Sequence, residues 1–205
     1  MSAEVVVHIV DDEEPVRNSL AFLLSISGYA VRVHDSATSF MRQAKGLTSA
    51  VLITDLRMPD MSGVDLIKRL RSESITIPAI VITGHGDVPM AVEAMKAGAI
   101  DFLEKPFEDD VIIGAVGRAI ELIEKRPGTP TDIESICERM AQLSEREHQV
   151  MQGVVAGQSN KAIAYNLDIS PRTVEVHRAN VMAKMNCKSL PELVRMVLSV
   201  SEAPQ

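Results

Sequence analysis

The sequence has no tryptophan, and aromatic residues make up only 3% of its 205 residues, whereas hydrophobic residues make up 46%. We therefore expect aliphatic cores built from Val, Ile, Leu, Met and Ala, with enough apolar residues for well-packed domains. A chain of this length is expected to form one large domain or two modest ones, and we take two as the starting hypothesis.

Long apolar runs and a basic leader are also lacking. No hydrophobic run approaches the roughly 18 residues of a membrane span, and the start MSAEVVVHIVDDEE has neither the basic segment nor the cleavage site of a signal peptide. The two cysteines, Cys137 and Cys187, are isolated and have no zinc-like spacing, so reduced structural thiols are expected. Together these features predict a cytoplasmic protein without a membrane partner.

Charge is distributed unevenly along the chain, whose net charge is −7. Residues 1–125 carry 19 Asp and Glu against 12 Lys and Arg, whereas residues 143–198 carry 5 against 7. An acidic first part and a slightly basic last part indicate different partners. A surplus of two bases is by itself weak support for nucleic-acid binding.

The first 125 residues alternate between strand-like and helix-like patterns. Short apolar runs end near five residues: Val10, Val33, Thr54, Thr83 and Leu103. Helix signals follow Pro15, Gly63, Pro89 and Asp109. VVVHIV, VLIT and AIVIT are nearly continuous and β-branched, as expected of strands covered on both faces. The pattern predicts an α/β fold, a doubly wound five-stranded parallel (βα)5 sheet over residues 1–125.

Polar residues gather where these strands end. Asp11 and Asp12 follow the first strand, Asp55 ends the third, Thr83 ends the fourth and Lys105 lies just past the fifth. Since such sheets bind ligands outside the carboxyl ends of their strands, we expect these residues to meet at one edge. Three carboxylates held together repel one another unless a cation intervenes, and a shallow oxygen-only site suits Mg²⁺.

Each residue taken singly has an ordinary explanation. A lone aspartate at a strand end is usually a turn or helix-cap residue, and a lone threonine or lysine indicates nothing. The joint placement at several strand ends favours a functional site. Two enzyme classes with similar chemistry fit poorly. A haloacid-dehalogenase-type phosphatase needs a second aspartate at the position of Arg57. A flavodoxin needs a loop after the first strand that binds the FMN phosphate, and the acidic DDEE segment at that place would repel this phosphate.

The segments DD at 11–12, TDLRMPDMSG at 54–63, TGHGD at 83–87 and FLEKPF at 102–107 resemble the receiver domain of bacterial two-component response regulators. The resemblance covers residues 4–125 and implies that Asp55 is the phosphoacceptor. It further implies that Asp12 and the backbone carbonyl of Arg57 bind the metal with Asp55, assisted by Asp11. A carboxylate is a competent nucleophile towards phosphorus once the incoming charge is neutralised.

The resemblance also assigns roles to the ends of the fourth and fifth strands. Thr83 and Lys105 would hold the phosphoryl oxygens, and movement of Thr83 would let the aromatic side chain of Phe102 act as a switch. The alternative for Phe102 is an ordinary core residue. The Lys105–Pro106 peptide bond is expected to be cis by resemblance.

The stretch 126–142 is predicted to be a linker with a short helix, because RPGTPT is rich in proline and glycine and DIESICERMAQL is amphipathic. Four helical segments follow over 143–205, opened by Ser144, Asn160, Ser170 and Ser189. The tight connections GQSN and DIS place the second and third as a helix-turn-helix, the later helix of which enters the DNA major groove.

The later helix has one face that should pack inward, formed by Val174, His177, Val181 and Met185. Residues available to DNA are Arg172, Thr173, Glu175, Val176 and Ala179 for bases, and Arg178, Lys161 and Lys184 for phosphates. The segment 143–199 resembles the LuxR-type DNA-binding domain. The acidic Glu175 departs from many relatives, which have lysine there, so it either reads a cytosine or weakens binding.

The order of the two halves resembles the FixJ family, the nitrogen-fixation response regulators of rhizobia. This resemblance implies an oxygen-sensing histidine kinase of the FixL type as partner, promoter DNA as ligand and RNA polymerase as the target of activation. We expect a transcription factor, not a dedicated enzyme, in which phosphorylation promotes homodimer formation on two half-sites. The alternative is a phosphate sink or protein-interaction module without productive DNA recognition.

Overall fold

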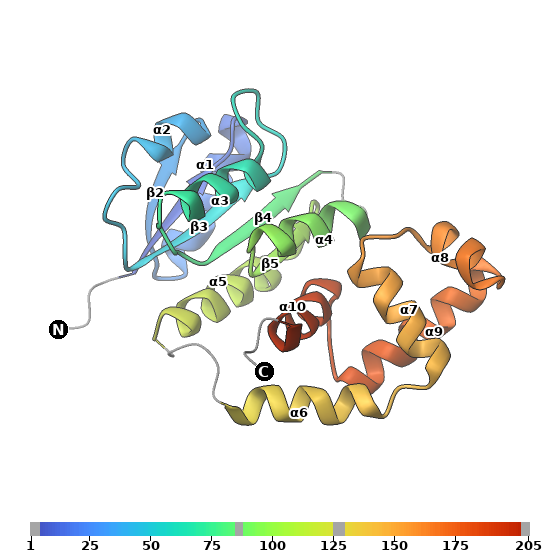
Figure 1. Cartoon of the computed structure of the whole chain (residues 1–205). Coiled ribbons are helices and arrows are strands. Elements are labelled where there is room, and N and C mark those ends of the chain that lie inside the picture. Colours follow the sequence, from blue (N-terminus) through green and yellow to red (C-terminus); the bar gives the residue numbers. More distant parts are fainter. Residues whose placement is uncertain (1–4, 85–87, 125–129, 202–205) are drawn as a thin grey trace. The chain divides into compact units, whose positions relative to one another are not determined.

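The computed structural model describes residues 5–84, 88–124 and 130–201 of the chain. Its contacts divide the chain into two units, Met1–Gly86 with Ala97–Arg126, and Asp87–Lys96 with Pro127–Gln205. Figure 1 shows the helices and strands along the chain. The two units contain separate hydrophobic clusters.

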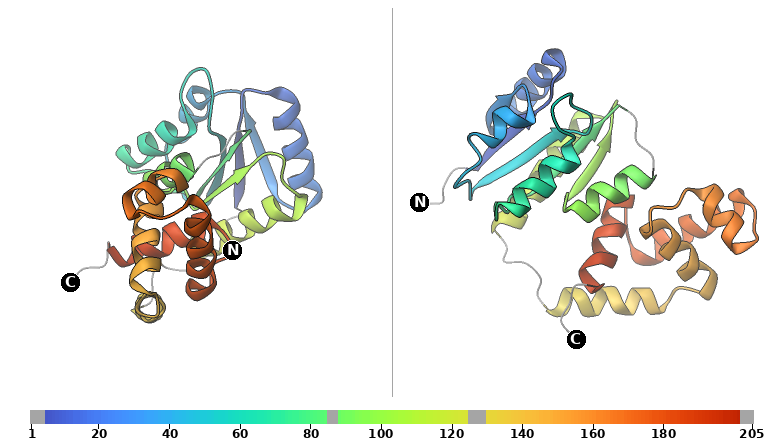
Figure 2. Two further views of the ribbon diagram at one scale, coloured as in Figure 1. Left: turned by 90° about the vertical axis from the view of Figure 1, so that its right-hand side faces the viewer. Right: turned by 45° about the horizontal axis from the view of Figure 1, so that its top comes forward.

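The first unit is organised around a parallel sheet of five strands. The strands are β1 (Val6–Val10), β2 (Ala30–His34), β3 (Ala50–Asp55), β4 (Ala79–Thr83) and β5 (Asp101–Glu104). Their order is β2-β1-β3-β4-β5, with β1 inside the sheet, and Figure 2 shows the sheet from two further sides. The strand order therefore reverses between β1 and β3, where sheets of this kind bind their ligands. The predicted doubly wound parallel sheet is confirmed.

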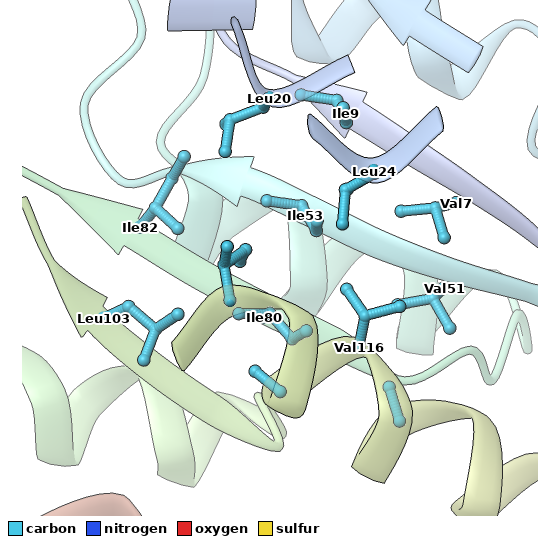
Figure 3. Packing of buried hydrophobic residues seen from close by; sticks show 13 residues of the cluster. Val7, Ile9, Leu20, Leu24, Val51, Ile53, Ile80, Ile82, Leu103 and Val116 are labelled. Atoms are coloured by element: carbon cyan, nitrogen blue, oxygen red, sulfur yellow. The ribbon is translucent and has the colours of Figure 1, made fainter. Parts of the chain in front are cut away.

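Alternate residues of the central strands form a hydrophobic core on one face of the sheet. All residues of β3 and β4 are buried, which explains their nearly continuous apolar sequences. One face packs against helices α1 (Glu14–Ile26) and α5 (Asp109–Glu124), as Figure 3 shows. This face is built from Val7, Ile9, Val51, Ile53, Ile80 and Ile82, with Leu20 and Leu24 of α1 and Ile112 and Val116 of α5.

Three further helices follow strands β2, β3 and β4. They are α2 (Ala37–Met41), α3 (Gly63–Ser72) and α4 (Val88–Ala97). The sequence patterns did not predict α2, which is only five residues long, although Ser36 caps it by accepting a hydrogen bond from Ser39 N–H at 3.2 Å. Helix α3 packs against α2 and β4.

The second unit contains the helices α6 (Pro130–Ala141), α7 (Glu145–Val155), α8 (Asn160–Leu167), α9 (Pro171–Met185) and α10 (Leu190–Ser201). Helix α6 corresponds to the short helix predicted in the linker. It contributes Ile136 to the core of this unit, and its Arg139 donates to the backbone oxygen of Met185 at 2.9 Å. The four helices after it confirm the predicted helical domain.

Side-chain caps define where these helices begin. Ser144 and Glu147 form a reciprocal capping box at α7, and Ser170 caps α9. Helix α8 begins at Asn160, as predicted, and its cap is the preceding Ser159, whose hydroxyl accepts from Ala162 N–H. None of the helices in the described ranges is long and apolar enough to cross a membrane.

Candidate acidic site and candidate nucleic-acid interface

Strand β3 delivers Asp55 to the edge of the sheet, where this residue is only 7% exposed. Leu56 continues the ladder past it by donating to Ile82 O at 2.8 Å, and Arg57 N–H donates to Asp55 Oδ2 at 2.6 Å. Helix α3 begins close to this strand at Gly63. A Cβ atom there would collide with the carbonyl oxygen of Asp55, so glycine allows the close approach.

Lys105 joins the two buried carboxylates of the site. Its Nζ donates to Asp11 Oδ2 at 3.0 Å and to Asp55 Oδ1 at 2.9 Å. Burial opposes the charge, yet the hydrogen bonds and charges of Asp55 and Asp11 outweigh it and raise the pKa of Lys105. The backbone N–H of Lys105 donates to Thr83 O at 2.7 Å, and the Lys105–Pro106 bond is cis, as predicted.

Asp11 lies deepest in the site and is fully buried. Its Oδ1 accepts from Glu13 N–H at 2.8 Å, and its backbone oxygen accepts from the Arg17 guanidinium at 2.7 Å. Burial raises the pKa of Asp11, although the hydrogen bonds from Lys105 and Glu13 oppose this rise. The site therefore holds a carboxylate whose charge is costly unless a cation is near.

The donor chemistry of this edge fits a hard divalent cation. Within the described ranges, no group of three or more His, Cys, Asp and Glu side chains is arranged to hold a metal ion. Asp11 and Asp55 nevertheless lie close enough to share the ammonium of Lys105, and the exposed Asp12 adjoins Asp11 in the chain. Carboxylate oxygens together with the Arg57 carbonyl are the ligand types that Mg²⁺ prefers.

Thr83 and Phe102 lie on the same face of the sheet. Residues Val81 and Phe102 are register partners, as are Thr83 and Glu104, so Thr83 is diagonal to Phe102 across the two strands. Ile82 belongs to the cluster on the opposite face, and Thr83 is 1% exposed. Phe102 is half-buried.

A buried aromatic cluster lies beside the site and was not anticipated from the sequence. His8 Nδ1 and His34 Nε2 are 3.0 Å apart, the two rings are stacked, and Phe40 meets both edge-on. Desolvation, followed by the charges of His34 and Arg32, lowers the pKa of His8 to about 4, and desolvation also lowers the pKa of His34. The only hint in the sequence is that His8 interrupts an apolar strand.

The buried histidines predict a loss of stability in mild acid. Because the pKa of His8 falls from 6.5 to about 4 on folding, the unfolded chain binds more protons between these values. Neutral His8 therefore contributes about 3 kcal/mol to the free energy of unfolding. This contribution is complete above pH ~6.5 and is lost as the pH falls towards ~4. Urea unfolding across this range should show a flatter pH dependence for His8→Phe, and identical slopes would contradict the prediction.

The second unit presents helix α9 after a short turn from α8. Asp168 takes a left-handed conformation with φ 54°, which ends α8 and lets the chain turn into α9. Val174, Val181 and Met185 are buried in the core as predicted, while His177 is half-buried with a shielded Nδ1 atom. The exposed residues of α9 include Arg172, Glu175, Val176 and Ala179, and Val176 is 56% exposed.

Two basic residues of α9 are engaged within the unit. Arg178 is half-buried and donates to Asn160 Oδ1 at 2.7 Å. Lys184 Nζ donates to Glu147 Oε2 at 2.6 Å and to Gln142 O at 3.2 Å. The prediction that Arg178 and Lys184 contact phosphates did not foresee these bonds. Thr173 is likewise held at the start of α9 by its side-chain bond to Ser170, at 2.8 Å.

The ion pair of Lys184 leads to a test that separates a structural role from a phosphate contact. Lys184 and then the Ser144 N–H lower the pKa of Glu147 to about 2, so the stability they confer is present above pH ~4.5 and lost on acidification. Lys184→Met should lower the unfolding temperature and leave the salt dependence of DNA binding unchanged.

The matched control is Lys161→Met on α8, which removes an exposed lysine that is also predicted to contact phosphate. That change should reduce the slope of log affinity against log salt by about 1 without lowering stability. A reduced slope for Lys184→Met would instead assign Lys184 to the DNA interface.

Comparison with known proteins agrees with this two-part organisation. The family described as response regulator receiver domain matches residues 7–117, and the family described as bacterial regulatory proteins, luxR family, matches residues 141–197. The transcriptional regulatory protein FixJ of Rhizobium meliloti (strain 1021) is 63% identical over 198 residues, covering 97% of each chain.

Solved structures show the same likeness. Full-length FixJ from B. japonicum is 45% identical and matches with a TM-score of 0.58, covering 99% of this chain and 100% of that one. The structure named FixJ-N is 65% identical with a TM-score of 0.55, and it covers 58% of this chain and 94% of its own.

Proposed function

Because this chain belongs to the FixJ-type response regulators, which join a receiver domain to a LuxR-type DNA-binding domain, we propose that it is a transcription activator switched by phosphorylation of Asp55. Phosphorylation-dependent regulation is general in this family, and its members are transcription factors, not dedicated enzymes. The observation that carries the assignment is the bridge of Lys105 between Asp11 and Asp55.

Asp55 is the nucleophile in this proposal. Its Oδ1 attacks the phosphorus atom of a phosphohistidine or of a small acyl phosphate, and the leaving group departs with the electron pair of the broken bond. Arg57 N–H holds Oδ2 at 2.6 Å and thereby orients the carboxylate. Lys105 is placed to neutralise a phosphoryl oxygen once Asp55 has reacted.

Receiver domains generally bind Mg²⁺ at their acidic phosphorylation site. In this chain Asp12, Asp55 and the carbonyl of Arg57 would hold the ion, with Asp11 assisting. The ion would supply positive charge that stabilises the transferring phosphoryl group. Burial raises the pKa of Asp11. The positive charges of the ion and of Lys105 would therefore both stabilise the Asp11 carboxylate.

The phosphoryl group would be read by Thr83 and Phe102. A new dianion on Asp55 offers strong acceptor oxygens, and the hydroxyl of Thr83 donates to one of them. The inward movement of Thr83 vacates space on its face of the sheet, which the ring of Phe102, diagonal to it on β5, then fills. This change in the surface around β5 promotes pairing of two receiver domains.

Helix α9 is the part that reads DNA in this proposal. Arg172, Glu175, Val176 and Ala179 face the bases, because they are exposed and not committed to the core. Dimerisation brings two such helices to neighbouring half-sites. The second contact is then made at a high effective concentration, so two weak modules bind tightly.

The partners follow from the family and from the relatives. The receiver domain implies a sensor histidine kinase, and the LuxR-type domain implies DNA binding. We extend this, on the likeness to FixJ, to an oxygen-responsive kinase of the FixL type, to nitrogen-fixation promoters and to recruitment of RNA polymerase.

The test combines mass and DNA binding. Analytical ultracentrifugation of the full chain, with and without acetyl phosphate and Mg²⁺, should show a shift from monomer to dimer. Selection of binding sites from random DNA should yield two half-sites only with the phosphorylated form. An unchanged mass together with no sequence preference would support a phosphate sink instead.

A further inference from the structure

The loop that follows Asp55 is fastened at a second point, Asp60. The carboxylate oxygen Oδ2 of Asp60 accepts hydrogen bonds from the backbone N–H and from the hydroxyl of Thr38, each at 2.8 Å. Burial opposes the charge, yet the bonds from Thr38 and Ala37 hold the pKa of Asp60 below its usual value. An exposed side chain therefore joins two segments that are 22 residues apart in sequence.

Thr38 is a firm attachment point because its helix is anchored. The neighbouring Ala37 and Phe40 of α2 are fully buried. The ring of Phe40 lies 5.4 Å from that of His8 and 5.2 Å from that of His34, meeting both edge-on. Helix α2 is thus held against β1 and β2 by a packed aromatic cluster.

The same anchored region also contacts the other loop of the acidic site. The backbone oxygen of His34 accepts a hydrogen bond from Asp11 N–H at 3.3 Å. One loop of the site is therefore linked to this region through His34, and the other through Thr38. The link through Asp60 acts on the segment between Asp55 and Gly63, which contains the Arg57 carbonyl.

We propose that Asp60 is a positioning residue for phosphoryl transfer: by fastening its loop to Thr38, it holds the Arg57 carbonyl where it completes the cation site with Asp55. This inference rests on the proposed function of Asp55 and adds a residue that never touches the phosphoryl group. Without the tether, the loop keeps its attachments at Arg57 and Gly63, so the site loosens without the domain unfolding.

The expected loss of Mg²⁺ affinity on removing the hydrogen bonds between Asp60 and Thr38 can be estimated from comparable residues in other metal sites. Residues that orient metal ligands from a distance typically change metal affinity by about 10-fold to 100-fold when removed. Asp60 acts on a backbone ligand from three residues away and is exposed, so we expect the lower end, about tenfold. The maximal rate at saturating Mg²⁺ should change less, because the nucleophile and Lys105 stay in place.

The experiment measures Mg²⁺ binding to the full-length chain by isothermal titration calorimetry, without any phosphodonor. Asp60→Ala should weaken binding about tenfold, and Thr38→Val, which retains the backbone donor, should weaken it less. The double variant should be no worse than Asp60→Ala alone, because both changes break one connection. Phosphorylation by acetyl phosphate should then show a raised half-saturating Mg²⁺ concentration with a smaller change in maximal rate.

Two controls separate the tether from the loss of charge. Asp60→Asn keeps an acceptor oxygen for Thr38 and should retain most of the affinity, whereas Asp65→Ala removes a comparable exposed carboxylate of α3 and should leave affinity unchanged. Wild-type affinity in Asp60→Ala, or equal losses in Asp60→Asn and Asp60→Ala, would overturn the inference. If the wild type itself binds no Mg²⁺ and accepts no phosphoryl group, the proposed function fails first.

Discussion

Replacing Asp55 with asparagine should abolish phosphorylation by acetyl phosphate and remove the entire gain in DNA affinity that accompanies it. In the wild type we expect this gain to be about a hundredfold, since two linked half-site contacts replace one. An amide cannot attack phosphorus, while asparagine preserves the size of the side chain and an oxygen for Arg57 N–H. Intact-mass spectrometry and DNA titrations with and without the donor measure both effects.

The matched control for this change is Asp65→Asn, which removes one exposed acid on helix α3. It should dimerise and bind DNA as the wild type does after phosphorylation. If Asp55→Asn responds to acetyl phosphate as strongly as the wild type, then another residue is modified and the acidic site has a structural role only.

Replacing Lys105 with methionine should both destabilise the first unit and slow phosphoryl transfer. The change leaves the carboxylates of Asp11 and Asp55 together without the ammonium that bridges them at 3.0 and 2.9 Å. Removing one partner of a buried ion pair costs about 3 kcal/mol. Loss of a positioned cation at the reacting group should slow transfer from acetyl phosphate by about a hundredfold.

The cause of this destabilisation can be checked by pH and by Mg²⁺. Because burial raises the pKa of Asp11, losing Lys105 moves that pKa further upward, so the folded state binds a proton more readily than the unfolded chain does on acidification. The loss of stability of the variant relative to the wild type should therefore be smaller at pH ~5 than at pH ~7, and Mg²⁺ should reduce it at pH ~7.

Urea unfolding at both pH values, with and without Mg²⁺, supplies the measurement. Lys45→Met, which removes one exposed positive charge outside the site, should behave as the wild type under all four conditions. Equal stability of Lys105→Met and the wild type at pH 7 without Mg²⁺ would show that the two carboxylates do not need this cation.

Local features of the fold were predictable because they are encoded within a few residues. The apolar run AIVIT predicted the buried strand β4, Ser144 predicted the start of α7, and Ser170 with Pro171 predicted the start of α9. Short helices are different. Helix α2 has too few residues for a period to show, and it is held by contacts of Phe40 with two strands.

The acidic site was predictable as a set of residues but not as a set of bonds. Parallel strands place their carboxyl ends at one edge, so Asp11, Asp55 and Lys105 could be grouped from their positions alone. The hydrogen bonds between Asp60 and Thr38 could not be predicted, because the sequence MPD in a loop does not indicate which distant residue the aspartate contacts.

The interface residues of α9 illustrate the same division. Helical periodicity separated the buried Val174 and Val181 from the exposed Glu175 and Val176. It placed Lys184 on the surface as well, where the structure pairs it with Glu147 of α7. Periodicity describes which face a residue occupies and carries no information on what another helix offers to that face.

By itself, the sequence determined the parallel sheet, the helix starts, the acids at the strand ends and the helix-turn-helix, because hydrophobic periodicity and capping act between near neighbours. Tertiary structure alone decided the pairings of charged and aromatic groups. Lys105 meets Asp11 across 94 residues and Lys184 meets Glu147 across 37. Such partners are chosen when distant segments pack together, and the free energy of each pairing depends on the burial that packing creates.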